Sequence, residues 1–184
     1  LKTDEYIIDA ARFLAEHYHN LSPFYKALKL STYQKKDFTF PVSSAASNRF
    51  ITAWCERMRR IKYIDSYELC DSGAVEVDIS NLSEAGFFIY GTWLEVLLRN
   101  HVAYFLKQNY ARIKSFDVLS RIVVINKKGR IITEYDLLLM INEALYYIEC
   151  KSKMGDSNKD YQKFKNNIHR LGIQPAHSAL LIPE

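Results

Sequence analysis

The sequence predicts an α+β fold, in which a helix-rich first part is followed by a mixed β-sheet flanked by helices. Three observations support this prediction. Apolar residues recur at helical spacing in several segments. Short runs of β-branched and aromatic residues are separated by turns of two or three residues. The chain has 184 residues and is 48% hydrophobic, so it can form a core of its own.

The first part of the chain reads as three helices and a hairpin. The predicted helices cover residues 4–19, 22–30 and 43–61, with Pro23 expected at the first position of the second helix and a polar, lysine-bearing loop before the third. Two strands follow on either side of a turn at Asp71-Ser72-Gly73. Three helices and a hairpin are the order of a winged helix, so residues 1–88 are predicted to form a winged-helix-like linker domain.

The third of these helices carries a group of arginines, and two interpretations of it stay open. The residues are Arg49, Arg57, Arg59 and Arg60. They could read duplex DNA, or the segment could serve as a linker or a dimer surface. Residues 1–88 hold 11 basic and 12 acidic residues, a balance that does not favour binding to a polyanion.

Residues 89–184 are predicted to form a second, layered domain. A short apolar strand is expected at the boundary, ending at Gly91, followed by a helix over 92–109. Three strands joined by tight turns are expected at 120–126, 130–141 and 144–152, then a helix over 157–171 and a last strand at 178–183 that reads as too apolar for a sheet edge. Helix, antiparallel meander, helix and strand indicate a layered sheet.

Positive charge is concentrated in this second part. Residues 89–184 hold 14 basic and 9 acidic residues. Residues 151–170 alone hold six basic and two acidic residues. Such a face suits a polyanion such as nucleic acid, although a solvated helix surface has the same composition. The candidates for contacts with phosphates are Lys153, Lys159, Lys163 and Arg170.

Other patterns limit the class of protein. No run of 18 apolar residues and no apolar leader occur, so neither a membrane span nor a membrane partner is expected. The three cysteines are odd in number and far apart, which is typical of a reducing cytoplasm. The sequence begins with Leu1 rather than methionine, so we expect it to be part of a longer protein.

Charged residues in the two most apolar strands are the main indication of chemistry. A turn at Asn142-Glu143 would place Asp136 opposite Glu149 on the neighbouring antiparallel strand, and Lys151 would share the face of Glu149. Two facing carboxylates repel each other, by up to about 1 kcal/mol when exposed, and a cation removes that repulsion. Mg²⁺ or Mn²⁺ is expected, because both prefer carboxylate oxygens. Lys151 would stabilise negative charge on a phosphate.

Structural roles for the same residues are open alternatives. Asp136 could accept a hydrogen bond from a backbone amide, and Glu149 with Lys151 could be a salt pair on one strand face. Glu134 is a possible accessory ligand or a surface residue. Gln162, on the basic helix, is a possible accessory residue that positions a water or a phosphate.

These residues carry a resemblance to a known superfamily. Asp136, twelve intervening residues and Glu149-Cys150-Lys151 resemble the PD-(D/E)xK nuclease signature, with Tyr135 where that signature has proline. Together with the helix start Gly91-Thr92-Trp93-Leu94-Glu95 and the strand Thr133-Glu134-Tyr135-Asp136, they are similar to the CRISPR-associated nucleases that join a CARF sensor, a winged-helix linker and a PD-(D/E)xK domain.

The resemblance implies a function and a site. It implies a restriction-endonuclease-like sheet and a homodimer that cleaves single-stranded RNA or DNA with a divalent metal. The sensor that binds cyclic oligoadenylate in that family would lie outside this sequence. It also implies a site role for Glu95, which could instead complete a capping box with Thr92 or pair with Arg99. The expected catalytic set is therefore Asp136, Glu149, Lys151 and Glu95, and its three acids are the expected metal ligands.

Two other functions fit the same sequence. One is a restriction or repair endonuclease that acts on duplex DNA. The other is a nucleic-acid-binding module without catalytic activity. Cleavage of duplexes would favour the first, and binding without metal-dependent cleavage would favour the second.

Overall fold

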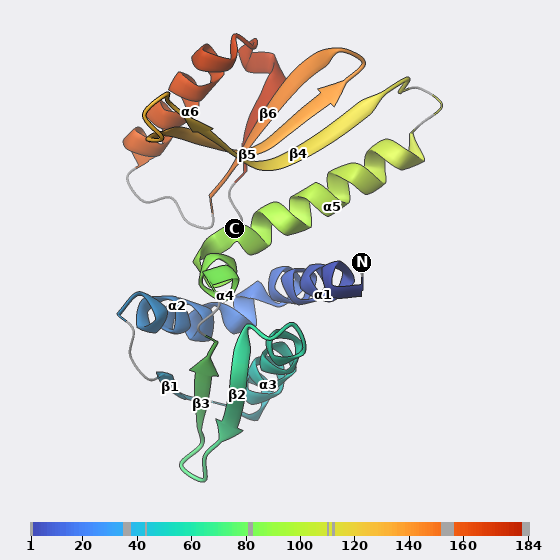
Figure 1. The fold of residues 1–184 in the computed structure, drawn as a ribbon. Coiled ribbons are helices and arrows are strands. Elements are labelled where there is room, and N and C mark those ends of the chain that lie inside the picture. Colours follow the sequence, from blue (N-terminus) through green and yellow to red (C-terminus); the bar gives the residue numbers. More distant parts are fainter. Residues whose placement is uncertain are drawn as a thin grey trace. The chain divides into compact units, whose positions relative to one another are not determined.

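The structure is a computed structural model that describes residues 2–34, 38–42, 44–80, 83–109, 111, 113–151 and 157–181 (Figure 1). It confirms the predicted α+β class. The chain divides into two compact units, Leu1–Val96 and Leu97–Glu184. The domains predicted at 1–88 and 89–184 stay predictions, because compactness alone does not define a functional boundary.

The first unit contains the three helices and the hairpin that were predicted, with one further strand between the second and third helices; its assignment as a winged helix stays a prediction. Its elements are α1 (Lys2–Glu16), α2 (Tyr18–Gln34), β1 (Phe38–Pro41), α3 (Ala45–Arg60), β2 (Ile64–Leu69), β3 (Ala74–Ile79), α4 (Ser83–Phe87) and the π-helical turn η1 (Phe88–Thr92). The three strands form an antiparallel sheet in the order β1-β3-β2. The hydroxyl of Ser44 caps α3 by accepting the backbone N–H of Ser47.

Strand β1 lies within the segment that was predicted to be a loop. Its aromatic residues explain why it forms. Phe38 is buried, and the ring of Phe24 from α2 contacts both Phe38 and Phe40. A strand of four residues is too short to be recognised from its sequence pattern. Its pairing partner, Ala74–Val77, also lies far along the chain.

Two local predictions in the first unit are wrong. Pro23 is not the first residue of its helix but lies inside α2, which begins at Tyr18. The apolar stretch before Gly91 is not a strand but continues from α4 into the turn η1. A short apolar run cannot be assigned to helix or strand from its periodicity alone. Gly91 has φ of 143°, a conformation that residues with a side chain rarely adopt, and it makes the kink before α5 (Trp93–Gln108).

The second unit, which takes in α5 from Leu97 onward, is built on a four-stranded mixed sheet. Its further elements are β4 (Phe116–Ile125), β5 (Ile131–Ile141), β6 (Ala144–Cys150), α6 (Ser157–Leu171), η3 (Pro175–His177) and β7 (Ser178–Leu181). The strand order is β4-β5-β6-β7, antiparallel up to β6, with β7 parallel to β6. Contrary to the sequence-based expectation, the apolar strand β7 is an edge strand. It is short, as edge strands often are.

The register between β5 and β6 is the predicted one. Leu137 pairs with Ile148, and Ile141 pairs with Ala144. Asn142 and Glu143 have φ of 47° and 70°, which is the conformation of a two-residue hairpin turn matched to the strand twist. The observed pairing ends at Leu137 and Ile148, directly before Asp136 and Glu149.

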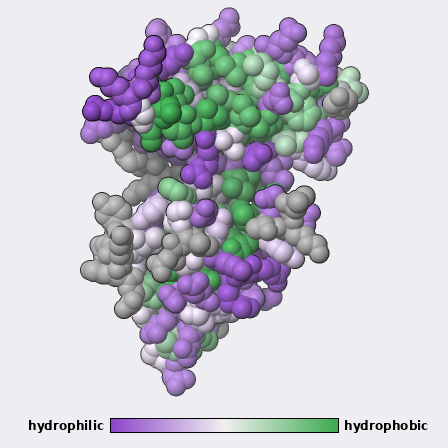
Figure 2. Space-filling view, in the orientation of Figure 1, coloured by the Kyte–Doolittle hydropathy of each residue, from purple (hydrophilic) through white to green (hydrophobic). Residues whose placement is uncertain are grey.

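Helix α6 covers one face of this sheet. The core between them consists of Tyr135, Tyr147, Phe164 and Ile168. Along β4 every second residue is exposed, and three of these are large and apolar: Leu119, Val123 and Ile125. Figure 2 shows apolar surface gathered on this unit.

Candidate active site

A break in the alternation of β5 brings Asp136 into the interior. Tyr135, Asp136 and Leu137 are consecutive, yet all three are buried. On β4, Arg121 lies between the partners of Leu137 and Tyr135 and has φ of 54°. Such irregularities re-aim side chains in a sheet. The strand can therefore bury Tyr135 against α6 and Asp136 beside the end of β6.

Asp136, in the middle of β5, lies beside the end of β6, where Glu149 and Lys151 are found. Oδ2 of Asp136 accepts the backbone N–H of Cys150 at 2.7 Å. Oε1 of Glu149 lies 2.6 Å from Nζ of Lys151 and 3.3 Å from Nζ of Lys163. The Glu149 side chain is fully buried, whereas that of Lys151 is 20% exposed. The cluster thus joins two carboxylates to two ammonium groups at the edge of the core.

The structural roles left open by the sequence are both present. Asp136 does accept a backbone amide, and Glu149 does form an ion pair with Lys151. Neither role excludes catalysis, since hydrogen bonds of this kind also hold catalytic groups in place. The catalytic role of these residues stays a prediction.

The two carboxyl groups have opposite pKa shifts. Burial and the nearby charge of Glu149 raise the pKa of Asp136 to about 6, against the opposing effects of the Cys150 amide and the lysines. For Glu149, burial alone would raise the pKa, but hydrogen bonds from Lys151 and Tyr147 hold it below its ordinary value. Glu149 therefore stays ionised, and its charge helps to raise the pKa of Asp136.

Asp136 and Glu149 fit a divalent cation chemically. Two buried carboxylates that repel each other are the ligand type that Mg²⁺ and Mn²⁺ prefer. Added positive charge would oppose the burial and the repulsion from Glu149 that raise the pKa of Asp136. Within the described residues, no cluster of three or more His, Cys, Asp or Glu side chains is placed to hold a metal. Two carboxylates therefore need water or substrate oxygens to complete a coordination shell, as is usual for Mg²⁺.

Three residues that the sequence did not mark as site residues are linked to Glu149 through successive hydrogen bonds. The Tyr147 hydroxyl donates to Oε2 of Glu149. Nδ2 of Asn167 donates to the Tyr147 oxygen at 2.9 Å, and the Thr133 hydroxyl donates to Oδ1 of Asn167 at 2.9 Å. A signal was available for one of them, since Asn167 interrupts the apolar stripe that Phe164, Ile168 and Leu171 form on α6.

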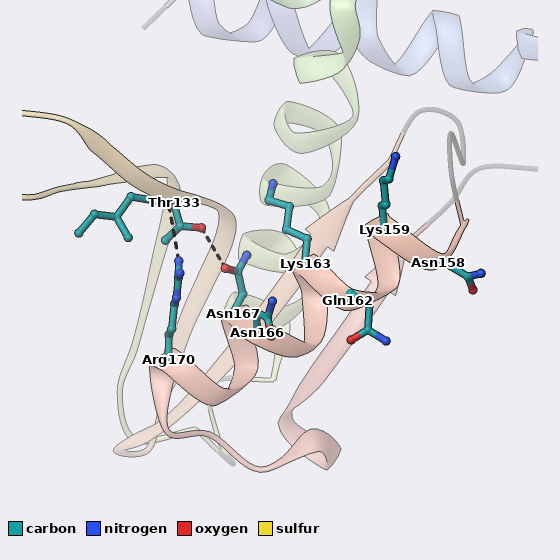
Figure 3. A pocket seen from close by; sticks show the side chains of 9 residues that line it. Thr133, Asn158, Lys159, Gln162, Lys163, Asn166, Asn167 and Arg170 are labelled. Atoms are coloured by element: carbon teal, nitrogen blue, oxygen red, sulfur yellow. Dashed lines mark hydrogen bonds between the residues drawn. The ribbon is translucent and has the colours of Figure 1, made fainter.

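A groove runs along α6 next to this cluster (Figure 3). It encloses about 480 Å³ and is lined by Ile132, Thr133, Asn158, Lys159, Gln162, Lys163, Asn166, Asn167 and Arg170. Three of these side chains are cationic and the lining holds no carboxylate. Lys163 belongs to both the groove and the ion pair with Glu149. The groove is therefore cationic, and Lys163 links its wall to the Glu149 carboxylate.

The structure places the other predicted site residues as follows. Lys159, Lys163, Arg170 and Gln162 line the groove. Lys153 lies outside the described residues. Glu134 is exposed, unlike Asp136, and its accessory role stays a prediction. Glu95 belongs to the first unit, in the first turn of α5, and its site role is likewise a prediction.

The arginines of α3 are largely engaged within the first unit. Nε of Arg57 lies 3.1 Å from Oδ2 of Asp9, and its guanidinium group stacks over the Phe13 ring. Arg59 pairs with Glu56 on the same helix. These contacts favour a structural role for the helix over a DNA-reading one.

Two solved structures resemble the chain over most of its length. One is the protein VC1899 from Vibrio cholerae, with a TM-score of 0.61 and 20% identity over 98% of this chain and 52% of that one. The other is Can2 from Sulfobacillus thermosulfidooxidans in complex with cyclic tetra-adenylate, with a TM-score of 0.54 and 16% identity over 89% of this chain and 42% of that one.

The chain shares their fold. At these identities the likeness concerns the fold alone, and the chain spans about half the length of the solved proteins that it matches. No protein-family model and no curated protein matches the sequence. Among the described helices, none is long and apolar enough to cross a membrane.

Proposed function

We propose that the chain is the effector part of a CRISPR-associated antiviral nuclease that hydrolyses phosphodiester bonds of single-stranded RNA or DNA with Mg²⁺ or Mn²⁺. The observation that carries the proposal is the meeting of Asp136, Glu149 and Lys151 on adjacent strands. Two buried acids and an ammonium group beside a cationic groove suit the hydrolysis of a charged polymer better than they suit a core. The shared fold with VC1899 and Can2 supports the same proposal.

Each residue has a chemical role in this proposal. Asp136 and Glu149 would hold the cation, and a site role for Glu95 stays a prediction of its own. A bound divalent cation would lower the pKa of water and offset charge on the phosphate. Lys151 stabilises negative charge on the phosphate oxygens as it increases during attack. Lys159, Lys163 and Arg170 hold the phosphodiester backbone in the groove along α6, and Gln162 positions a phosphate or a water.

The assembly and regulation of the protein are part of the proposal. The exposed apolar residues of β4 support a homodimer, and cyclic oligoadenylate would act through a domain outside this sequence. Can2 was solved with cyclic tetra-adenylate, and this chain corresponds to less than half of that protein. The protein is proposed to work in the cytoplasm, in keeping with its three free cysteines.

A panel of substrates and metals tests the proposed function. Labelled single-stranded RNA, single-stranded DNA and duplex DNA are each incubated with the protein in Mg²⁺, Mn²⁺ or EDTA, beside Glu149→Gln. We expect cleavage of a single strand that EDTA and Glu149→Gln both abolish. Preferential cleavage of duplex DNA would instead favour a restriction or repair enzyme. Binding without any cleavage would favour a non-catalytic module.

A further inference from the structure

Three buried residues on three elements form a one-directional chain of hydrogen bonds that ends on Glu149. Thr133 lies on β5, Asn167 on α6 and Tyr147 on β6. Because the Asn167 carbonyl accepts the Thr133 hydroxyl, its amide nitrogen faces Tyr147. Because the Tyr147 oxygen accepts that amide, its own proton is directed to Oε2 of Glu149. Every donor in the chain points toward the carboxylate.

These groups are largely shielded from solvent. Exposed fractions are 8% for Thr133, 1% for Asn167, and 0% for both Tyr147 and Glu149. Burying four polar side chains is less favourable than packing apolar ones unless all of them are satisfied. An apolar core of Phe and Leu would serve stability alone equally well. The arrangement is therefore better explained by what it does to Glu149.

The hydrogen-bond chain occupies Oε2 of Glu149, so other partners meet Oε1. Oε2 is occupied by Tyr147, so the carboxylate cannot rotate freely, and Oε1 faces Lys151 and Lys163. A ligand or a catalytic acid must be held within a fraction of an ångström to act well. Partners that orient a metal ligand without touching the metal typically change affinity or activity about 10- to 100-fold when they are removed.

We propose that Thr133, Asn167 and Tyr147 are positioning residues that orient Glu149 toward its cation and substrate; this inference rests on the function proposed above. Since Thr133 and Asn167 also line the groove (Figure 3), the hydrogen-bond chain connects the wall of the groove to the carboxylate.

Two matched pairs of variants test this inference. Tyr147→Phe removes the last donor, and Tyr146→Phe makes the same change one residue away, where the ring stacks on His177 outside the hydrogen-bond chain. Thr133→Val removes the first donor while keeping the shape, and Thr133→Ser keeps the donor. The main readout is Mn²⁺ affinity without nucleic acid, measured from the electron paramagnetic resonance of free Mn²⁺. The midpoint of urea unfolding is measured in parallel.

We expect Tyr147→Phe to weaken Mn²⁺ binding roughly 10-fold or more, and Thr133→Val to weaken it by a smaller factor. Tyr146→Phe and Thr133→Ser should bind as the wild type does. Where cleavage is measured, the loss should fall on kcat rather than KM. Wild-type affinity in both Tyr147→Phe and Thr133→Val, with only the urea midpoint lowered, would overturn the inference and leave the nuclease proposal standing. If Tyr147→Phe does not fold, the Mn²⁺ affinities of Thr133→Val and Thr133→Ser decide whether the inference holds. A wild type that binds no Mn²⁺ would refute both proposals.

Discussion

Oδ2 of Asp136 accepts the backbone N–H of Cys150 at 2.7 Å, which joins β5 to β6 between the two residues expected to do chemistry, Glu149 and Lys151. The carboxylate is 9% exposed. Any change at Asp136 therefore acts on the packing of the two strands as well as on the charge of the site, and experiments have to separate these effects.

Removing the ammonium group of Lys151 should abolish most of the cleavage without unfolding the protein. In Lys151→Ala, Lys163 still neutralises Glu149, but the charge opposite the phosphate is lost. We expect cleavage to fall by roughly 100-fold or more, measured under single-turnover conditions. Glu143→Gln, in the exposed hairpin turn, is the control and should cleave normally. Undiminished cleavage by Lys151→Ala with a normal circular dichroism spectrum would contradict the assignment.

Asp136 should make the metal-free protein less stable as the pH rises. Its pKa is about 6 in the folded protein and lower in the unfolded chain, so the folded state binds the proton more tightly. The stability contributed by the protonated group is present at pH 4 and is lost as the pH passes 6. In EDTA, Asp136→Asn should be more stable than the wild type at pH 8 by roughly 1 to 3 kcal/mol, as measured by urea unfolding.

The same measurement with Mg²⁺ provides the control for that prediction. A bound cation should stabilise the wild type at pH 8 and have little effect on Asp136→Asn, because the variant lacks one ligand. Identical pH dependence of the two proteins in EDTA would mean that Asp136 is not under the electrostatic stress inferred from its surroundings.

Binding of single strands along α6 should depend on salt and on the groove lysine Lys159. Each lost phosphate contact lowers the slope of log affinity against log salt by about 0.7 for a single strand. Lys159→Gln should show this reduction in fluorescence anisotropy titrations. Lys165→Gln is the matched control, because Lys165 lies over the Tyr161 ring rather than in the groove lining. If both variants show the same slope of log affinity against log salt, the groove is not part of the surface that binds single strands.

Arg57 should contribute to stability rather than to nucleic-acid binding. Arg57→Ala loses the ion pair with Asp9 and the contact with Phe13, which together are worth about 1 kcal/mol at a partly exposed site. We expect a lower urea midpoint and unchanged affinity for duplex DNA. Arg49→Ala serves as a comparison on the same helix. A marked loss of duplex binding in Arg57→Ala would favour the restriction or repair alternative.

The register between β5 and β6 could be predicted from the sequence because a two-residue turn determines it. Once Asn142 and Glu143 are recognised as the turn, the pairing of β5 with β6 follows without further information, whereas the burial of Asp136 depends on the break in the alternation of β5. The three helices and the hairpin of the first unit were predictable for the same reason, since each has its own local pattern. These features depend on residues close together in the chain.

The features that could not be predicted from the sequence depend on contacts between residues that are far apart in the chain. Nothing near Tyr147 in the chain identifies Asn167 as its partner. Strand β1 depends on Phe24 and on the remote strand β3. The apolar stretch before Gly91 was assigned to a strand because a buried helical turn and a buried strand look alike over five residues.

The parallel pairing of β7 with β6 has a consequence for synthesis of the protein. The backbone N–H of Lys151 donates to the carbonyl of Leu181 at 2.9 Å, so the strand that carries Glu149 gains its second neighbour only through a segment made after α6. On the ribosome, the acids and the lysine emerge well before the strand that anchors them. A nascent chain therefore cannot hold the finished arrangement until translation has passed residue 181.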